Sequence, residues 1–274
     1  MEKKKNVYFA QPWGGLGDNF VFSNLPRLYD NIGIGFNLSF LNYERNSEIK
    51  KTVWRSNPFV KSKLSLNYPN IGSRKLNKFE IKEHNLNVVQ KINIYHGFEK
   101  GDGYPDIYLE KDELPSYKYQ NVIDFNAFSM FNTQETIYDL DKLIELRFEL
   151  NNPESYFLHY PNLYDTEKTK ENLISSDSIN DLIEILLSTE TFYCLNSGSH
   201  CLAAVLKKNY GYPKKIVSYL PNLELTDLYS FGHVYENVDY LSTPGLKNDN
   251  ISMPRKMRIY TGLIKKYFND TDNL

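Results

Sequence analysis

A glycine-rich stretch near the start of the chain constrains its fold more than any other feature. It reads Gln11-Pro-Trp-Gly-Gly-Leu-Gly-Asp-Asn19, follows the apolar run Val7 to Ala10, and precedes the largely apolar segment Phe20 to Leu28. This order predicts a strand, a glycine loop and a helix that Pro26 cuts short. Three glycines in four positions let backbone amides approach a ligand closely, and the helix N-terminus behind them favours negative charge.

Asp18 is the carboxylate of this loop, and two interpretations of it stay open. A carboxylate in the first helical turn is favoured by the helix dipole, so Asp18 could serve only as a cap. Alternatively, the carboxyl end of the first strand presents Asp18 to a cleft as a general base. A dinucleotide-binding loop fits less well, because Phe20 stands where the G-x-G-x-x-G fingerprint needs its third glycine.

Composition places the chain among ordinary globular proteins. Its 274 residues, 41% of them hydrophobic, are enough for one large or two smaller domains with a proper core. The net charge of -2 gives no global argument for nucleic acid or for an anionic membrane. The early apolar run is too short for a signal peptide, so we expect a cytoplasmic protein. Cys194 and Cys201 lack CxxC spacing and are expected to be buried, reduced thiols.

The first half of the chain is predicted to form a βαβ pattern. The expected elements are strands over 34–41, 59–67 and 88–95 and a short helix over 48–54. His96 to Gly103 is a second glycine-rich loop after a strand, which we interpret as a turn in preference to a substrate-contacting loop. Pro115 and Ser116 are the best candidate for an inter-domain linker.

The pattern then restarts in the second half. The expected elements are strands over 121–125, 156–160, 192–195 and 216–220, helices over 133–150, 179–187 and 201–206, and a short helix or loop over 165–174. Ser178 or Asp177 caps the helix 179–187. The stretch from Pro221 to Gly245 looks irregular. Pro254 opens a final basic amphipathic helix, which fits either a solvated face or peripheral contact with the inner face of a membrane.

A second candidate site follows the strand 192–195, which runs straight into Asn196-Ser-Gly-Ser-His200. Ser197, Gly198 and Ser199 can turn amides and hydroxyls toward an anion at a helix N-terminus, as phosphate groups require. His200 is either a ligand-binding residue or a hydrogen-bonded core histidine. Two successive α/β halves, each with an anion-friendly loop at the end of a strand, predict a cleft between two domains.

Three stretches in the same order resemble glycosyltransferase family 9, the ADP-heptose lipopolysaccharide heptosyltransferase family. They are Gly-Gly-Leu-Gly-Asp-Asn with Pro26 and Leu28, then Asp106-Ile-Tyr-Leu with Leu114-Pro115, and then 178–187 followed by Phe-Tyr-Cys-Leu-Asn-Ser-Gly-Ser-His-Cys-Leu-Ala-Ala. The resemblance implies an α/β GT-B fold, in which two Rossmann-like domains with parallel sheets face a cleft. Residues 1–116 would then form the acceptor-side domain, 117–253 the nucleotide-sugar domain, and 254–274 a C-terminal amphipathic helix and tail.

The resemblance also implies the reaction: inverting, metal-independent transfer of a sugar from a nucleotide-sugar to a hydroxyl of a cell-surface glycan or lipopolysaccharide-type acceptor, with no cofactor. Asp18 would be the base. The acceptor-side glycine loop would contain Trp13, Gly14, Gly15, Gly17 and Asn19. The donor side would contain Ser197, Gly198, Ser199 and His200, together with Asn196, His159 and Asn180. These last three stand where relatives often carry an acid, a lysine and another acid.

Two alternatives to this interpretation stay open, and neither involves nucleic acid. The first is a GT-B fucosyltransferase that uses GDP-fucose, because Gly-Gly-Leu-Gly also opens chains of that kind; there the next residues usually run Asn-Gln, unlike Asp18-Asn19. The second is a catalytically silent glycan-binding protein that retains the fold.

Overall fold

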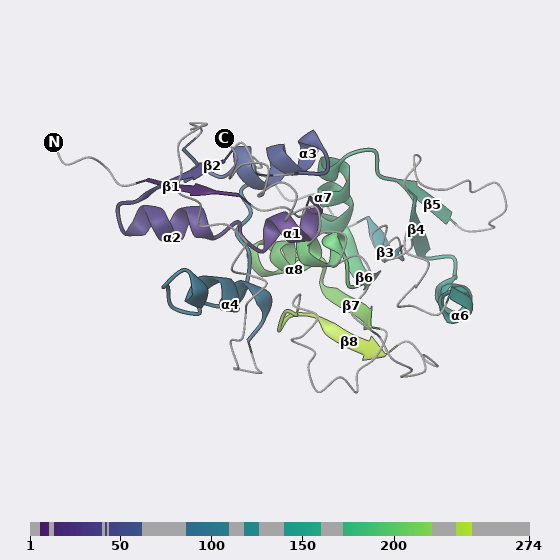
Figure 1. Cartoon of the computed structure of the whole chain (residues 1–274). Coiled ribbons are helices and arrows are strands. Elements are labelled where there is room, and N and C mark those ends of the chain that lie inside the picture. The colour runs from purple at the N-terminus through teal and green to yellow at the C-terminus, as the bar shows by residue number, and fades with distance from the viewer. Residues whose placement is uncertain are drawn as a thin grey trace, which may run out of the picture.

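The computed structural model describes residues 6–10, 14–39, 42, 44–61, 86–109, 118–125, 140–159, 172–220 and 234–242, with the backbone alone for 140–144 and 242. Within these ranges the strands form two separate sheets, one of two strands and one of six, and every pairing between neighbouring strands is parallel (Figure 1). The predicted α/β class with parallel sheets is confirmed.

The small sheet pairs β1 (Asn6–Phe9) with β2 (Gly35–Leu38). The strands of the large sheet are β3 (Tyr119–Asp124), β4 (Ser155–His159), β5 (Asn172–Ser175), β6 (Thr189–Leu195), β7 (Lys215–Leu220) and β8 (Asp239–Ser242). Their spatial order is β5-β4-β3-β6-β7-β8. Because all of them run the same way, their carboxyl ends meet along one edge, the edge where ligands bind in open α/β sheets.

Helices connect these strands. They are α1 (Leu16–Phe20), α2 (Leu25–Asn31), α3 (Ser47–Ile49), the π-helix η1 (Lys50–Arg55), α4 (Val88–Tyr95), α6 (Leu140–Leu150), α7 (Ile179–Leu187) and α8 (Gly198–Tyr210). Helix α8 packs on β6 and β7 of the large sheet, on α7 beside it, and on α1 from the first half (Figure 1). It therefore joins the two halves.

The sequence of α8 suits this central position. Its residues from Ser199 to Leu206 are all buried, and all of them except His200 are small or apolar. Lys207 and Lys208 stand in the last turn, where positive charge complements the helix dipole. Gly211 ends the helix with φ 78°, a left-handed conformation that glycine adopts without strain. The helix is thus longer at both ends than the predicted 201–206.

Aromatic side chains build much of the core around the first sheet. The ring of Phe9 lies 4.9 Å from that of Phe22, 5.5 Å from that of Phe36 and 5.7 Å from that of Trp54, centroid to centroid. All four are at most 1% exposed. They belong to the same buried cluster as Phe192 of β6 and the apolar residues of α8. One continuous core therefore holds the small sheet against the large one.

The prediction of a strand over 88–95 is wrong, because these residues form α4. The Asn87 side chain accepts a hydrogen bond from Gln90 N at 3.0 Å, and Gln90 Oε1 accepts one from Asn87 N at 3.1 Å. This reciprocal capping box begins the helix, whose buried Val89 and Ile92 lie one turn apart. The loop His96 to Gly103 consequently follows a helix rather than a strand.

Three smaller expectations are also wrong. Pro26 ends no helix but lies in the first turn of α2, where its missing N–H removes no hydrogen bond. Residues 172–174 belong to strand β5 and not to a helix or loop. Strand β8 lies inside the stretch 221–245 that looked irregular.

Other predictions fall on residues that the structure does not describe. They include the helix after Pro254, the linker at Pro115 and Ser116, and most of the strand 59–67, of which Val60 forms an isolated bridge with Phe36. The domain boundary at 116 therefore stays a prediction.

An ion pair between Arg27 and Asp106 anchors the segment after α4 to α2. Arg27 Nε and Nη2 donate to the two carboxylate oxygens of Asp106 at 2.7 and 3.0 Å. Tyr108 OH donates to Asp106 Oδ2 at 3.0 Å, and Ser23 Oγ donates to the Asp106 carbonyl at 2.7 Å. The side-chain hydrogen bond with Asp106 raises the pKa of Arg27. This network holds the Asp106-Ile-Tyr-Leu stretch in place.

Asp106→Asn is expected to lower the free energy of unfolding by about 1 kcal/mol, because it weakens a two-pronged, charge-assisted contact that is partly shielded from solvent. Asp102→Asn is the matched control. Asp102 pairs with Lys208, but its side chain is 64% exposed, so this change should have an effect of less than about 0.5 kcal/mol. Urea unfolding of both variants measures the difference. An equal loss of unfolding free energy in the two variants would contradict the anchoring role of Asp106.

His96 makes stability depend on pH. Its Nδ1 lies 2.9 Å from Tyr29 OH, and burial lowers the pKa of His96 to about 4. The unfolded chain, with a pKa near 6.5, binds this proton more strongly than the folded chain does. The stabilisation is therefore complete above about pH 6.5 and is lost progressively as the pH falls toward 4.

His96→Asn should flatten this dependence, because its amide can still accept the Tyr29 hydroxyl but does not titrate. The wild type should lose at most about 3 kcal/mol relative to this variant between pH 7 and pH 4. Urea unfolding at several pH values measures the difference, and carboxylate effects cancel in it. A wild-type slope in His96→Asn would contradict the assignment.

Candidate functional site

The two loops singled out by the sequence meet in the structure. Helix α1 begins after Gly15, α8 begins after Ser197, and the two helices pack together. A Cβ atom on Gly198 would lie 2.9 Å from Leu16 Cβ, closer than real Cβ contacts, and 3.1 Å from Gly17 N, closer than most of them. Glycine at 198 is therefore required for this approach. The glycine loop of the first half and the serine loop of the second therefore lie directly against each other.

Asp18 is half-buried in the first turn of α1 and caps that helix. Its Oδ2 accepts a hydrogen bond from Gly15 N at 3.2 Å. A Cβ on Gly15 would lie 2.8 Å from the same oxygen, so glycine also leaves room for the cap. The cap interpretation is confirmed. It does not decide against a role as base, because this bond engages one of the two carboxylate oxygens.

Asn19 is buried and serves the loop rather than a ligand. Its side chain is 0% exposed, its Oδ1 accepts from Trp54 Nε1 at 2.8 Å, and its Nδ2 donates to Gly15 O at 2.9 Å. Asn19 thus belongs to the predicted glycine loop, and its side chain supports that loop from inside. The sequence did not indicate that Trp54 contacts this loop, since nothing in its neighbourhood along the chain shows that it reaches Asn19.

The other glycine-loop residues are placed by backbone contacts. Arg45 N donates to Gly14 O at 2.8 Å, which ties the segment before α3 to the loop. Gly14 and Gly17 are buried. Trp13, the remaining residue of the predicted acceptor loop, lies outside the described residues.

The N-terminus of α8 is arranged for an anion. Ser197 is its N-cap residue, with φ -139° and ψ -174°, yet its side chain makes no capping hydrogen bond to the helix. Instead, Ser197 Oγ lies 2.9 Å from Ser199 Oγ. The first amides of α8 thus lack a side-chain cap, and two hydroxyls stand beside them. Amides and hydroxyls at the positive end of a helix dipole suit a phosphate or a similar anion.

His200 is a core residue. Its side chain is 0% exposed and lies between the rings of Tyr235 and Tyr240, at 5.4 and 5.6 Å from their centroids. His200 Nε2 is 2.9 Å from Tyr240 OH, which also accepts from Tyr235 N at 2.8 Å. The structure therefore agrees with the interpretation of His200 as a hydrogen-bonded core histidine, and contact with a donor stays a prediction.

The remaining donor-side candidates lie along the same edge of the large sheet. His159 ends β4, which β3 separates from β6. Asn196 directly follows β6 and is 6% exposed. Asn180 is exposed in the first turn of α7, where the preceding amide, Ile179 N, donates to Glu48 Oε2 of α3 at 3.1 Å. A residue of the first half thus reaches the start of α7, beside Asn180.

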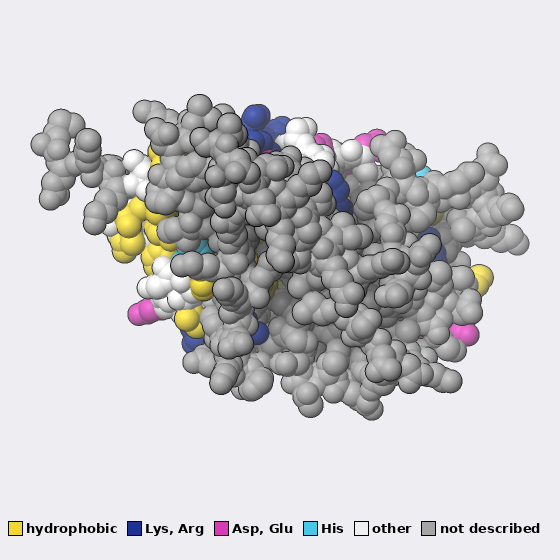
Figure 2. Space-filling view, viewed as in Figure 1, with side chains coloured by type: hydrophobic (Ala, Val, Ile, Leu, Met, Phe, Trp, Pro, Cys, Tyr) yellow, Lys and Arg dark blue, Asp and Glu magenta, His cyan; other side chains and the backbone are white. Residues whose placement is uncertain are grey.

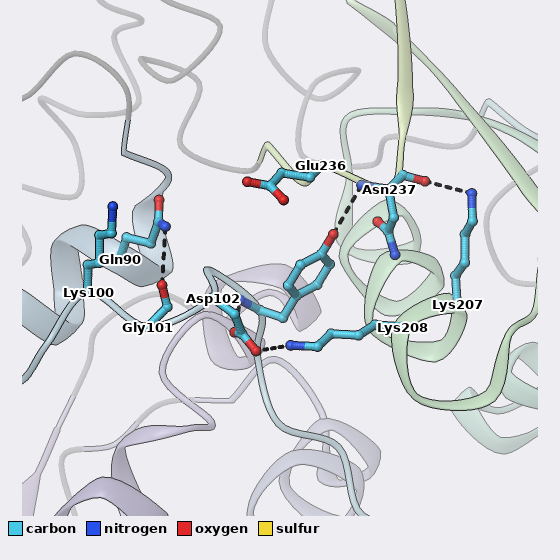
Figure 3. Close-up of a pocket in the computed structure, with 9 residues that line it drawn as sticks. Gln90, Lys100, Gly101, Asp102, Lys207, Lys208, Glu236 and Asn237 are labelled. Atoms are coloured by element: carbon cyan, nitrogen blue, oxygen red, sulfur yellow. Dashed lines mark hydrogen bonds and ion pairs between the residues drawn. The ribbon is translucent and has the colours of Figure 1, made fainter.

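A separate cavity of about 590 Å³ lies at the other end of α8 (Figure 3). There Lys208 pairs with Asp102 and lies over the ring of Tyr104, while Lys207 Nζ donates to Asn237 O at 2.8 Å. Asn237 N donates to Tyr104 OH at 3.0 Å. Both lysines are engaged, and the C-terminus of a helix disfavours anions. This cavity therefore suits a diphosphate less well than the N-terminus of α8 does.

The described part of the chain contains neither a cluster of metal-ligating side chains nor a helix that could span a membrane. No group of three or more His, Cys, Asp or Glu side chains there is placed to hold a metal ion. Cys194 and Cys201 are buried thiols that form no disulfide, as predicted, and burial raises the pKa of Cys194. Among the described helices, none has the length and apolar character needed to cross a bilayer.

Comparison with known proteins connects this geometry to solved structures. The chain is similar to the iron-containing dodecameric glycosyltransferase TibC from enterotoxigenic E. coli H10407, with a TM-score of 0.57 and 11% identity over 98% of this chain and 77% of that one. A complex of the heptosyltransferase TibC with ADP-D-β-D-heptose gives a TM-score of 0.56 and 11% identity over 89% of this chain and 64% of that one.

A glycosyltransferase of family 9 from Veillonella parvula DSM 2008 is also similar, with a TM-score of 0.55 and 9% identity over 94% of this chain and 96% of that one. No protein-family model and no curated protein matches the sequence. At these identities the similarity concerns the fold, and it confirms the predicted GT-B architecture.

Proposed function

We propose that this chain is a glycosyltransferase that moves a sugar from a nucleotide-sugar donor to a hydroxyl group. The observation that carries the proposal is the packing of Gly198 on Leu16 and Gly17, which brings the loop of Asp18 against the first turn of α8. A carboxylate base beside an anion site is what this transfer needs. The similar structures support it, since they are glycosyltransferases and one holds ADP-heptose.

In the proposed step, Asp18 is the general base. A hydroxyl is a poor nucleophile at neutral pH, so a positioned carboxylate must remove its proton. As the proton passes to Asp18, the acceptor oxygen bonds to the anomeric carbon of the sugar. The bond from that carbon to the phosphate oxygen breaks, and its electron pair leaves with the nucleoside diphosphate. Attack from the face opposite the leaving group inverts the anomeric configuration.

The departing diphosphate gains negative charge, and we propose that α8 stabilises it. The first amides of α8, the hydroxyls of Ser197 and Ser199, and the helix dipole all favour an anion at this point. In this proposal these groups perform the task that a divalent metal performs in other transferases.

The acceptor is proposed to be a cell-surface glycan or lipopolysaccharide-type molecule that approaches from the first half. Helix η1 contacts the glycine loop through the hydrogen bond from Trp54 to Asn19. It carries three basic residues, Lys50, Lys51 and Arg55. Figure 2 shows Lys and Arg side chains gathered at the top of the molecule, the region of α3 in Figure 1. Such charge favours an acceptor that carries phosphate or carboxylate groups.

A turnover assay tests the proposal. The protein is incubated with the common sugar conjugates of ADP, GDP, UDP and CDP and with glycan and lipopolysaccharide acceptors, with and without EDTA. Release of nucleoside diphosphate is measured together with product mass. We expect one donor class to be consumed and EDTA to have no effect. A folded preparation that binds no donor and turns none over would overturn the proposal. Glycan binding without donor binding would instead support the silent protein.

A further inference from the structure

We propose that Trp54 is a positioning residue for the transfer reaction. Its indole N–H, acting through Asn19, holds the glycine loop so that the Asp18 carboxylate keeps the geometry that proton removal requires. The inference rests on the proposed function of Asp18 as the base. Trp54 itself is fully buried, so it would act through Asn19 and not by direct contact with substrate.

Three successive hydrogen bonds connect Trp54 with Asp18. Trp54 Nε1 donates to Asn19 Oδ1 at 2.8 Å, Asn19 Nδ2 donates to Gly15 O at 2.9 Å, and Gly15 N donates to Asp18 Oδ2 at 3.2 Å. This relay runs from Trp54 in η1 to the Asp18 carboxylate. It passes through the Asn19 side chain and then through the carbonyl and the amide of Gly15 in the glycine loop.

The chemistry of the groups fixes the direction of the relay. An indole N–H can only donate, so Asn19 must present its oxygen to Trp54 and its NH₂ group to Gly15 O. Trp54 and Asn19 are each 0% exposed, so water does not replace a lost partner. A buried polar group without a hydrogen bond is destabilising. Only one orientation of the Asn19 amide therefore satisfies both of its partners.

Packing alone does not explain a tryptophan at this position. The ring of Trp54 stacks on Phe36 at 6.4 Å and 16° and tilts against Phe9 at 5.7 Å, contacts that a phenylalanine could also make. The indole N–H is the additional group. Its position is set by the π-helix, whose wide turn is closed by Ser56 N donating to Lys51 O at 3.1 Å. Such turns occur frequently at functional sites.

The glycine loop needs this support. Helix α1 has five residues, too few to be stable without tertiary contacts. Its first turn depends on Gly15, whose carbonyl accepts both Asn19 N at 3.1 Å and the Asn19 side chain at 2.9 Å. Removing the relay should therefore loosen the turn that carries Asp18.

Trp54→Phe tests the inference, because it removes the N–H and keeps an aromatic ring. Phe36→Leu is the matched control, since it weakens packing on the same ring and leaves the relay intact. We expect Trp54→Phe to lower kcat at least about tenfold with the donor KM within about threefold of wild type, whereas Phe36→Leu keeps kcat within about threefold. A kcat unchanged in Trp54→Phe, or lowered equally in Phe36→Leu, would overturn the inference.

A second readout does not require turnover. Amide hydrogen exchange of residues 14–20 should be at least about tenfold faster in Trp54→Phe and unchanged in Phe36→Leu. Asn19→Leu breaks the relay from the other side with the indole ring intact and should give the same faster exchange. The chain has two tryptophans, so the NMR indole signal of Trp54 is readily assigned, and it should shift in Asn19→Leu.

The two readouts separate this inference from the proposed function. If the wild type turns over no donor, the proposed function fails, and hydrogen exchange still decides whether Trp54 holds the loop. Unchanged exchange in both Trp54→Phe and Asn19→Leu would overturn the positioning role whatever the activity.

Discussion

Asp18→Asn is expected to lower kcat by about 10²- to 10⁴-fold, the usual contribution of a positioned general base. The dissociation constant of the donor should stay within about threefold, because the amide has nearly the same size and its oxygen can still accept the Gly15 N–H. What the variant loses is the ability to take a proton. Steady-state kinetics give kcat, and calorimetry gives the donor affinity.

Asp30→Asn is the control for this change. Asp30 belongs to α2 and pairs with Lys61 at 3.6 Å, away from the two loops. It should keep wild-type kcat. If Asp18→Asn also kept wild-type kcat, Asp18 would be only the helix cap that the structure shows, and the base would have to be another group.

Gly198→Ala is expected to damage both stability and turnover. The new Cβ would lie 2.9 Å from Leu16 Cβ and 3.1 Å from Gly17 N, and neither is the far end of a flexible side chain. Helices α1 and α8 would have to separate, at a cost of about 1–3 kcal/mol in the free energy of unfolding. Because the Asp18 carboxylate and the N-terminus of α8 would move apart, kcat/KM should fall at least about tenfold.

Gly97→Ala makes the same chemical change in the turn after α4. Gly97 has φ +83° and open space around its Cβ position, so alanine there meets backbone strain but no clash. It should be destabilising by about 1 kcal/mol with kcat/KM unchanged. Urea unfolding and donor kinetics compare the two variants. A Gly198→Ala protein with wild-type stability and activity would contradict the packing that joins the loops.

Helix caps and hydrophobic periodicity in the sequence predict those helices and strands whose formation depends mainly on residues close by in the chain. Helix α7 occupies the predicted residues 179–187, because Ser178 accepts from Asp181 N at 3.0 Å and the apolar residues follow the helical period. The valines and isoleucines of α4 favour a strand, whereas the capping pair Asn87 and Gln90 favours a helix. Two competing local signals were present, and tertiary packing favoured the helix.

In the candidate site, too, features set by neighbouring residues could be predicted and features set by distant contacts could not. Glycine and serine loops after strands are local patterns, so both loops could be identified from the sequence. The burial of His200 could not, because it depends on Tyr235 and Tyr240, more than thirty residues away along the chain. The bond from Trp54 to Asn19 also depends on how η1 packs on the glycine loop, which the sequence does not show.

The central claim is that the two loops form one nucleotide-sugar site with its anion-binding part at the start of α8. Isothermal titration of the wild type with ADP, GDP, UDP and CDP in EDTA tests it most directly, together with the double variant Ser197→Ala, Ser199→Ala. We predict that one nucleoside diphosphate binds without metal and that the double variant weakens it about tenfold or more. Absence of binding by all four, or equal affinity in the double variant, would contradict the claim.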